Sequence, residues 1–214
     1  SKQGFVYPTI GSGRSVNFLL EDIHGVLWAA TNDGINWLDG EIWIQYGYEL
    51  GSKVSFLLED SHGVLWAATN SGVWKIKATK VEATDEMQKY TTGLVSKTVL
   101  YLLEDNHGTL WVGTNEGVYW LNGERWQKYV YGLGPAMNEV KGSVSVRCLL
   151  EDSHGVLWAA TNNGIWQLMG EIWVKYTTNE GLEDDFVNYL LEDSRGTLWA
   201  ATNEGVSKLE DGIW

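Results

Sequence analysis

The sequence predicts an all-β protein in which five four-stranded antiparallel sheets form the blades of a five-bladed β-propeller. The main observation is a twelve-residue phrase that occurs five times in 214 residues, starting at Glu21, Glu59, Glu104, Glu151 and Glu192. The tryptophans of these phrases are separated by 38, 45, 47 and 41 residues, the period of a four-stranded propeller blade. Hydrophobic residues make up 44% of the chain and 25 residues are glycine, as expected of a packed protein rich in turns.

Each repeat contains four strand-like segments. The first begins at Val16, Val54, Val99, Val146 and Val187 and is apolar on both faces, as expected of a strand between two neighbouring sheets. The second reads "VLWAAT" or "TLWVGT", the third begins after a glycine, as in "GVYWL", and the fourth is of the "EIWIQY" type. Asp-x-His/Arg-Gly joins the first two segments and Thr-Asn-x-Gly joins the next two, and both patterns are typical of hairpins.

Such sheets cannot bury both faces alone, so the blades are expected to stack around an axis and close into a ring. Counting back from Val16 aligns Phe5 with Trp43 on a fourth strand, whereas the chain reaches Trp214 as the last repeat begins its own fourth strand. We therefore predict one domain, residues 1–214, in which residues 3–8 complete the last blade. Deletion of residues 1–10 is expected to expose a sheet edge and to destabilise the ring.

The segment from Tyr176 to Leu209, "YTTNEGLEDDFVNYLLEDSRGTLWAATNEGVSKL", resembles the two-component regulator propeller repeat. That repeat has Gly-Leu before the first strand, an acidic turn ending in glycine, Leu-Trp, a small or apolar pair, threonine and a later glycine. The pattern recurs in all five units, although the segments before Val54 and Val146 lack the plain Gly-Leu. The resemblance implies a bacterial sensor domain, periplasmic or extracellular and associated with glycan sensing, although five repeats replace the longer arrays common in that family.

Composition argues against several classes of partner. Formal net charge is −13, with 15 basic against 28 acidic residues and no basic cluster, so no nucleic-acid partner is expected. Apolar runs extend over only a few residues, so no membrane insertion is expected. Cys148 is the only cysteine, which excludes an intramolecular disulfide, and it is expected on a buried strand. The start "SKQGF" indicates a trimmed chain or fragment, and the sequence does not set the localisation.

The repeated Glu-Asp-x-His-Gly places carboxylates beside an imidazole, a combination found in metal sites and in acid–base catalysis. The fifth repeat has Arg195 in place of histidine, and the five turns are expected to lie far apart around one rim. Their side chains could not converge, so we predict no catalytic residue, no metal site and no cofactor. The aspartates are expected to bond within their turns, and the tryptophan of each phrase is expected in the core. For Trp43, Trp126 and Trp173 on the outer strands, core and surface positions both remain open.

Function is expected where the repeats differ, above all at the second residue of each first strand. This position holds Asn17, Ser55, Leu100, Arg147 and Asn188. The first strand of a blade lines the propeller axis, so Arg147 is expected in or beside the channel. It could hold a carboxylate ligand or pair with a neighbouring Asp or Glu, and the abundance of acidic side chains favours the pair.

The Thr-Asn-x-Gly turns should open on the face where the loops enter each first strand. Each asparagine could close its turn with its amide or contact a ligand, and turn chemistry favours the structural role. The following residue is acidic in three of five repeats, so a charged ligand of this rim should be a cation, or the ligand a polyol, rather than an anion. The asparagines are Asn32, Asn70, Asn115, Asn162 and Asn203.

The sequence thus predicts a non-enzymatic binding or sensing module for a glycan or another small polar ligand, and leaves a protein partner open. Three alternatives remain: a multivalent lectin with one site per blade, a recently amplified or designed scaffold without a ligand, and a lyase or hydrolase at the axial mouth. Several equivalent ligand sites would favour the lectin, one site the sensor, and none the scaffold.

Overall fold

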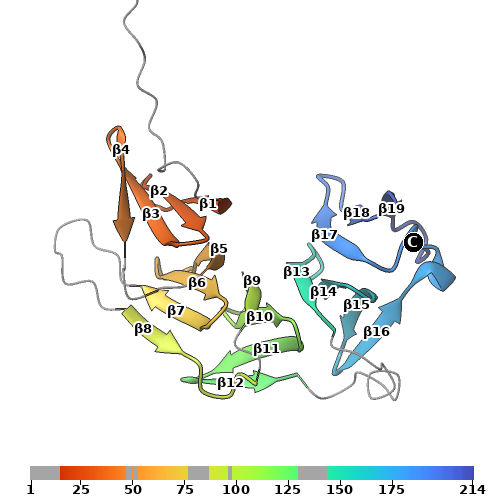
Figure 1. Cartoon of the computed structure of the whole chain (residues 1–214). Helices are drawn as coiled ribbons and strands as arrows, with labels where there is room; N and C mark the ends of the chain where they lie inside the picture. Colours follow the sequence, from red (N-terminus) through yellow and green to blue (C-terminus); the bar gives the residue numbers. More distant parts are fainter. Residues whose placement is uncertain (1–14, 47–49, 51–52, 77–86, 96–97, 130–143) are drawn as a thin grey trace, which may run out of the picture.

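The computed structural model describes residues 15–46, 50, 53–76, 87–95, 98–129 and 144–214. This part of the chain forms five antiparallel sheets, four of four strands and a last one of three, with the strands of each sheet in chain order. The sheets follow one another along an arc, the first strand of each lying innermost (Figure 1). These observations confirm the predicted all-β fold of five propeller blades.

The strands are short and regular. The first sheet contains β1 (Val16–Glu21), β2 (Leu27–Thr31), β3 (Gly34–Asp39) and β4 (Ile42–Tyr46). The second contains β5 (Val54–Glu59), β6 (Leu65–Thr69), β7 (Gly72–Ile76) and β8 (Met87–Tyr90). The third contains β9 (Val99–Glu104), β10 (Leu110–Thr114), β11 (Gly117–Asn122) and β12 (Arg125–Lys128).

The remaining sheets continue the pattern. The fourth contains β13 (Val146–Glu151), β14 (Leu157–Thr161), β15 (Gly164–Met169) and β16 (Ile172–Tyr176). The fifth contains β17 (Val187–Glu192), β18 (Leu198–Thr202) and β19 (Val206–Lys208). Helical structure in the described ranges is limited to 3-10 conformation, at Leu50 and at Thr178–Glu180, and no helix there is long and apolar enough to cross a membrane.

Every first strand contains an irregularity at the same place. In β13 the pairing with β14 shifts between Val146 and Cys148, which leaves Arg147 as the extra residue of a β-bulge. The same shift occurs in β1, β5, β9 and β17. A bulge changes the direction of a side chain, so the variable second position of each first strand is also a position with special geometry.

The hairpin between the first and second strands is fixed by its aspartate. In the third repeat one Asp105 carboxylate oxygen accepts the backbone N–H groups of His107 (3.0 Å) and Thr109 (2.8 Å). The other oxygen accepts the indole N–H of Trp111 (2.7 Å). All five repeats make these three bonds. The repeated phrase is therefore a structural unit in which the aspartate also orients the core tryptophan.

The core lies between consecutive sheets. Trp66 and Val73 of the second sheet pack against Val99 and Leu102 of the third, and the other three interfaces have the same composition. Small residues on the second strand allow this approach. At Gly113 a Cβ atom would lie 2.7 Å from a methyl carbon of Val146, so the third and fourth sheets need glycine there.

The outer tryptophans Trp126 and Trp173 are buried, which places both in the core and settles their position. Trp214, the last residue, has an equivalent location, because it is buried and packs on Trp158 with ring centroids 5.9 Å apart. Its carbonyl lies against Gly181, where a Cβ atom would be 2.0 Å from the oxygen and φ is +103°. The glycine of the Gly-Leu linker thus allows the backbones of neighbouring repeats to come into close contact.

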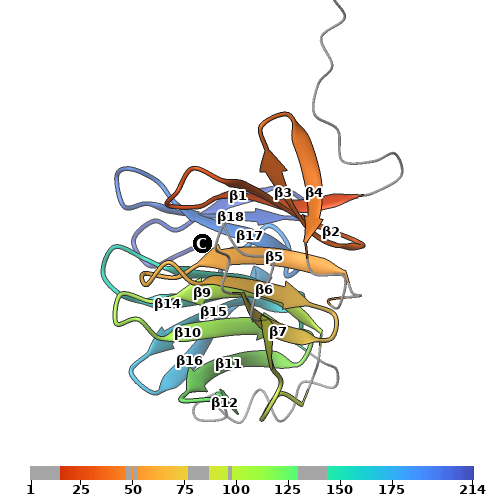
Figure 2. The ribbon, with the colours of Figure 1, turned by 90° about the vertical axis from the view of Figure 1, so that its left-hand side faces the viewer.

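The predicted closing strand, residues 3–8, lies outside the described residues, so closure by that strand stays a prediction. The first and last sheets stand at the two ends of the arc, apart from each other (Figure 1). From the side, the hairpins between first and second strands project on one face of the arc (Figure 2). The turns between second and third strands lie at the other ends of the strands.

Candidate ligand-binding rim

The Thr-Asn-x-Gly turns lie beside the starts of the first strands, on one face of the arc. In four repeats the backbone N–H of the turn asparagine donates to the carbonyl of the residue that directly precedes the first strand, at 3.1–3.2 Å. These pairs are Asn32 and Ser15, Asn70 and Lys53, Asn162 and Ser145, and Asn203 and Phe186. We call these five turns, together with the bulged residues of the first strands, the turn rim. Its position agrees with the geometry expected from the sequence.

Threonine, rather than asparagine, closes each turn. In the fourth repeat the Thr161 hydroxyl donates to the Gly164 carbonyl (2.7 Å) and accepts the N–H of Asn163 (3.0 Å). The hydroxyl-to-glycine bond recurs at Thr31, Thr69, Thr114 and Thr202. The turn chemistry inferred for the asparagine amides is thus performed by a neighbouring residue, and the side chains of Asn32, Asn162 and Asn203 accept hydrogen bonds from other groups.

Those partners differ between repeats. The Asn17 amide donates to Asn32 Oδ1 (3.1 Å) and to the Val54 carbonyl of the next sheet (2.8 Å), and Asn188 donates to Asn203 Oδ1 (3.0 Å). In the fourth repeat, by contrast, Asn162 Oδ1 accepts the backbone N–H of Ser145 (2.8 Å). Asn70 is exposed and Asn115 half-buried. The rim is therefore chemically uneven although its backbone repeats.

Arg147 is exposed at the bulge of β13. Its guanidinium carbon lies 4.7 Å from the centroid of the Phe186 ring, a cation–π contact with the linker that precedes β17. Within the part of the chain that the structure describes, no carboxylate forms an ion pair with this guanidinium. A guanidinium that lies over a ring keeps N–H groups available for hydrogen bonds, in the fork geometry that suits a carboxylate.

The linker that contains Phe186 also contacts the turn of the fourth repeat. The carbonyl of Asp185, next to Phe186, accepts the N–H of Gly164 (2.6 Å), so the linker lies across the turn of that repeat. Lys175 of β16 donates to Asn163 Oδ1 (2.7 Å) and lies 5.6 Å from the Trp166 ring. We call this group the Arg147 corner: Arg147, Phe186, Asn162, Asn163 and Lys175.

Three lysines beside the turns were not expected from the sequence. Lys89 lies over Trp74 and Lys128 over Tyr119, each on the fourth strand of its sheet, as Lys175 lies over Trp166. The sequence does contain a signal for these lysines. The residue that directly precedes the tyrosine of the fourth strand is lysine in three sheets and Gln45 in the first. Gln45 also reaches its turn, donating to the Asp33 carbonyl at 3.2 Å.

Ionisable groups elsewhere are explained by packing. Burial raises the pKa of the Cys148 thiol to about 11 and raises the pKa of Tyr101. The indole N–H of Trp199, followed by two backbone N–H groups, lowers the pKa of Asp193. Among the described residues no group of three or more His, Cys, Asp or Glu side chains is placed to hold a metal ion. Every histidine is exposed in the same hairpin position, on the face opposite the turn rim.

A family model described as a two-component regulator propeller matches residues 93–116, 141–163 and 181–204. Three of the five repeats thus match the two-component regulator propeller model. Each matched segment extends over a first strand, its aspartate hairpin and a second strand, which are the parts that repeat most closely. No curated protein sequence matches the chain.

Several solved structures are similar. PorZ, a surface component of the type-IX secretion system of Porphyromonas gingivalis, matches with a TM-score of 0.76 and 17% identity, over 100% of this chain and 34% of that chain. A streptogramin B lyase matches with a TM-score of 0.75 and 17% identity, over 95% of this chain and 67% of that chain. Virginiamycin B lyase from Staphylococcus aureus matches with a TM-score of 0.69 and 12% identity, over 94% of this chain and 71% of that chain. This chain thus spans about a third of PorZ, and at these identities the likeness shows the propeller fold alone.

Proposed function

We propose that these repeats form a non-catalytic binding or sensing module that holds an acidic glycan at the Arg147 corner. The observation that carries the proposal is the exposed Arg147 guanidinium, stacked on Phe186 and free of a carboxylate partner among the described residues. A guanidinium held in this way can take a ligand carboxylate through two parallel hydrogen bonds. The resemblance of the repeats to the two-component regulator propeller family implies a sensor domain associated with glycans, which supports a sugar as the ligand class.

The fourth repeat suits an anionic sugar better than its neighbours. The residue after the turn asparagine is acidic at Asp33, Glu116 and Glu204, whereas the fourth repeat has the neutral Asn163. Arg147 and Lys175 both bring positive charge to this repeat, and the amides of Asn162 and Asn163 can pair with hydroxyl groups. We therefore expect the preference predicted for the rim, for cations or polyols, to be reversed at this repeat.

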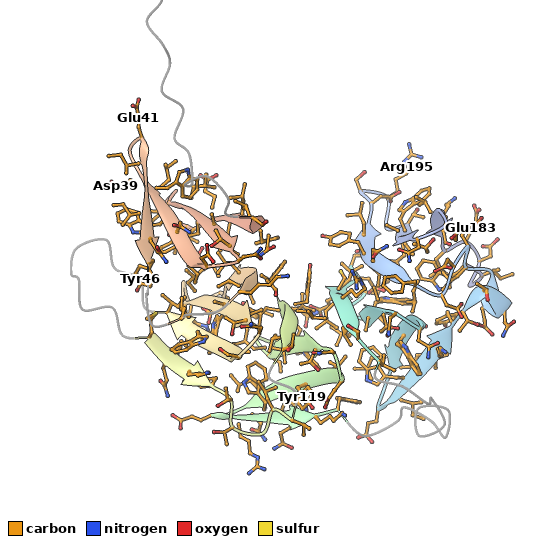
Figure 3. All side chains as sticks on the ribbon, in the orientation of Figure 1. Asp39, Glu41, Tyr46, Tyr119, Glu183 and Arg195 are labelled. Carbon is orange, nitrogen blue, oxygen red and sulfur yellow. The ribbon has the colours of Figure 1, made fainter. Side chains whose placement is uncertain are left out.

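The test is isothermal titration calorimetry with oligosaccharides that contain a uronic acid and with neutral oligosaccharides of the same length. We expect one site per chain, preference for the acidic sugar, and weaker binding at high salt. Arg147→Gln should weaken binding by about tenfold or more, because it removes the charged, forked donor. Arg195→Gln is the matched control, since Arg195 projects from the hairpin of the last sheet (Figure 3). Equal binding by both variants and the unmodified chain would contradict the proposal.

A multivalent lectin is the second candidate, because a lysine stacked on an aromatic ring recurs beside the turns of three sheets. A lectin of this kind would bind several ligands of similar affinity per chain. Arg147→Gln would then remove only a fraction of the sites, and the triple substitution of Lys89, Lys128 and Lys175 by Gln would remove the rest. The calorimetric stoichiometry separates the two candidates.

A scaffold without a ligand and an enzyme at the axial mouth predict other results. The scaffold predicts no heat of binding with any sugar. Among the similar structures, the H270A variant of the S. aureus lyase is described as catalytically inactive. We favour binding over catalysis here because the histidines of this chain are all exposed in equivalent hairpins, where their backbone N–H groups bond the turn aspartate. A bound sugar recovered unchanged after prolonged incubation would agree with this view.

A further inference from the structure

We infer that the last sheet of one chain docks on the first sheet of a second copy of the chain, through the contacts that already join consecutive sheets. Two surfaces are involved. The leading face is the side of the β1–β4 sheet directed away from β5, and the trailing face is the side of the β17–β19 sheet directed away from β13 (Figure 1). Inside the chain, each interface joins one face of the trailing kind to one of the leading kind.

Both end faces are apolar and uncovered. On the leading face Leu19 is 53% exposed, whereas its equivalents Leu57, Leu102 and Leu149 are each 1% exposed. On the trailing face Val206 is 62% exposed, whereas its equivalent Ile165 is 0% exposed. Since the repeats share one sequence pattern, the missing neighbour explains the difference, and the two faces have the composition of the two halves of a buried interface.

A carboxylate joins the sheets at every internal interface. Glu104 accepts the backbone N–H of Ser61 at 2.6 Å and its hydroxyl at 2.8 Å. Glu59, Glu151 and Glu192 make the corresponding backbone bond to the preceding sheet. We call this contact the glutamate clasp. Its two halves are unused at the ends: within the described residues Glu21 accepts no hydrogen bond, and Ser194, the equivalent of Ser61, donates none.

One further contact between sheets is also half made. Asn17 donates both to Asn32 within its sheet and to the Val54 carbonyl of the next, while its equivalent Asn188 makes only the first bond, to Asn203. The acceptor that Asn188 lacks would be the carbonyl of Val16 in the first sheet of the second copy.

The third residues of the first strands form a stack of rings in the first three sheets, along the inside of the arc, and Cys148 interrupts this stack in the fourth sheet. Phe18 and Phe56 have centroids 4.1 Å apart, and Phe56 and Tyr101 4.2 Å apart. Tyr189 is the equivalent residue of the last sheet and is 50% exposed. Docking of a second copy would place Tyr189 of one chain beside Phe18 of the other, at the open end of the stack.

The arc explains why the partner is a second copy and not the other end of the same chain. The end sheets stand apart (Figure 1), so contact between them within one chain would require tighter curvature at the internal interfaces, each held by a glutamate clasp and a packed core. A second copy can dock without such changes. Because the two faces differ, the contact is heterologous and can repeat from chain to chain.

The first test is sedimentation velocity over a range of chain concentrations. We expect the average mass to rise with concentration, and Leu19→Glu or Val206→Glu to keep the chain monomeric by placing a charge in the interface. Both side chains are exposed in the single chain, so circular dichroism should show the same fold in the variants. Ile172→Glu is the control, because Ile172 is also exposed but lies at the hairpin of β15 and β16.

The second test uses the open halves of the glutamate clasp. Glu21→Cys chains mixed with Ser194→Cys chains should be linked into dimers by a short bismaleimide, whereas either variant alone should stay unlinked. The chain that carries both substitutions should give a ladder of oligomers. Cys148 is buried and its pKa is raised to about 11, so the unmodified chain serves as the unreactive control.

Three results would overturn the inference. The first is a mass that stays monomeric at every concentration. The second is association that survives both Leu19→Glu and Val206→Glu, which would place the contact elsewhere. The third is a doubly substituted chain that is linked only within itself, which would show that the end sheets of one chain meet.

Discussion

The fourth and first sheets contain almost the same phrase, "EDSHGVLWAATN" and "EDIHGVLWAATN", yet their burial differs. Asp152 and Asp22 make the same three hydrogen bonds in their hairpins. Leu149, however, is 1% exposed, and its equivalent Leu19 is 53% exposed. Local hydrogen bonding is therefore set by the repeat itself, whereas burial depends on a neighbouring sheet. Stability should accordingly divide into a term for each repeat and a term for each interface.

The largest expected effect concerns the leucine of the first strand. Leu149→Ala should lower the free energy of unfolding by about 2–5 kcal/mol, because it opens a cavity between two sheets. Leu19→Ala should lower it by less than about 0.5 kcal/mol, because the side chain is largely in solvent. Denaturant titrations at low chain concentration would measure both. Equal losses would show that the first sheet is covered in solution.

The glutamate clasp should show a smaller difference of the same kind. Glu104→Ala removes a carboxylate that accepts two hydrogen bonds from Ser61, so it should cost about 1–2 kcal/mol. Glu21→Ala should have almost no effect on a single chain. The same titrations measure this pair, and a cost at Glu21 as large as that at Glu104 would argue against an open end.

The turn asparagines sharpen the comparison further. Asn162→Ala should lower the free energy of unfolding by about 1 kcal/mol, because it deprives the Ser145 backbone N–H of its acceptor. Asn32→Ala should cost less, because the Asn17 amide that it leaves can turn to water. Thermal unfolding of both variants, together with sugar binding by Asn162→Ala, tests this order. Unchanged stability with lost binding would make Asn162 a recognition residue first.

The smallest effect is a pH dependence in the last sheet. The hydrogen bond from Trp199 lowers the pKa of Asp193 in the folded chain, so the ionised carboxylate stabilises the fold above the unfolded pKa, about 4. That contribution is lost as the pH falls through the lowered folded pKa. Asp193→Asn should therefore be less stable than the unmodified chain at pH 7, with a gap that closes on acidification. A gap independent of pH would contradict the assignment.

Much of this could be predicted from the sequence, because strands, hairpins and turns depend on local patterns. The first strands were expected to begin at Val16, Val54, Val99, Val146 and Val187, and they do. Contacts between repeats were harder to predict. The bond of Glu104 to Ser61 joins residues 43 positions apart, and no local pattern distinguishes that glutamate from an ordinary exposed one. Likewise, the sequence favoured the asparagine amides as the groups that close the Thr-Asn-x-Gly turns, and side-chain geometry shows that the threonine hydroxyls make the bonds across the turns.

The central claim is that the two end sheets have open, complementary faces, and hydrogen–deuterium exchange read by mass spectrometry tests it most directly. At low chain concentration, amides of β1 and β2 and of β18 and β19 should exchange faster than those of β13 and β14, because their sheets lack one neighbour. The difference should narrow as the concentration rises and the faces become covered. Equal protection of all five sheets in a dilute single chain would contradict the claim and show that the first and last sheets meet.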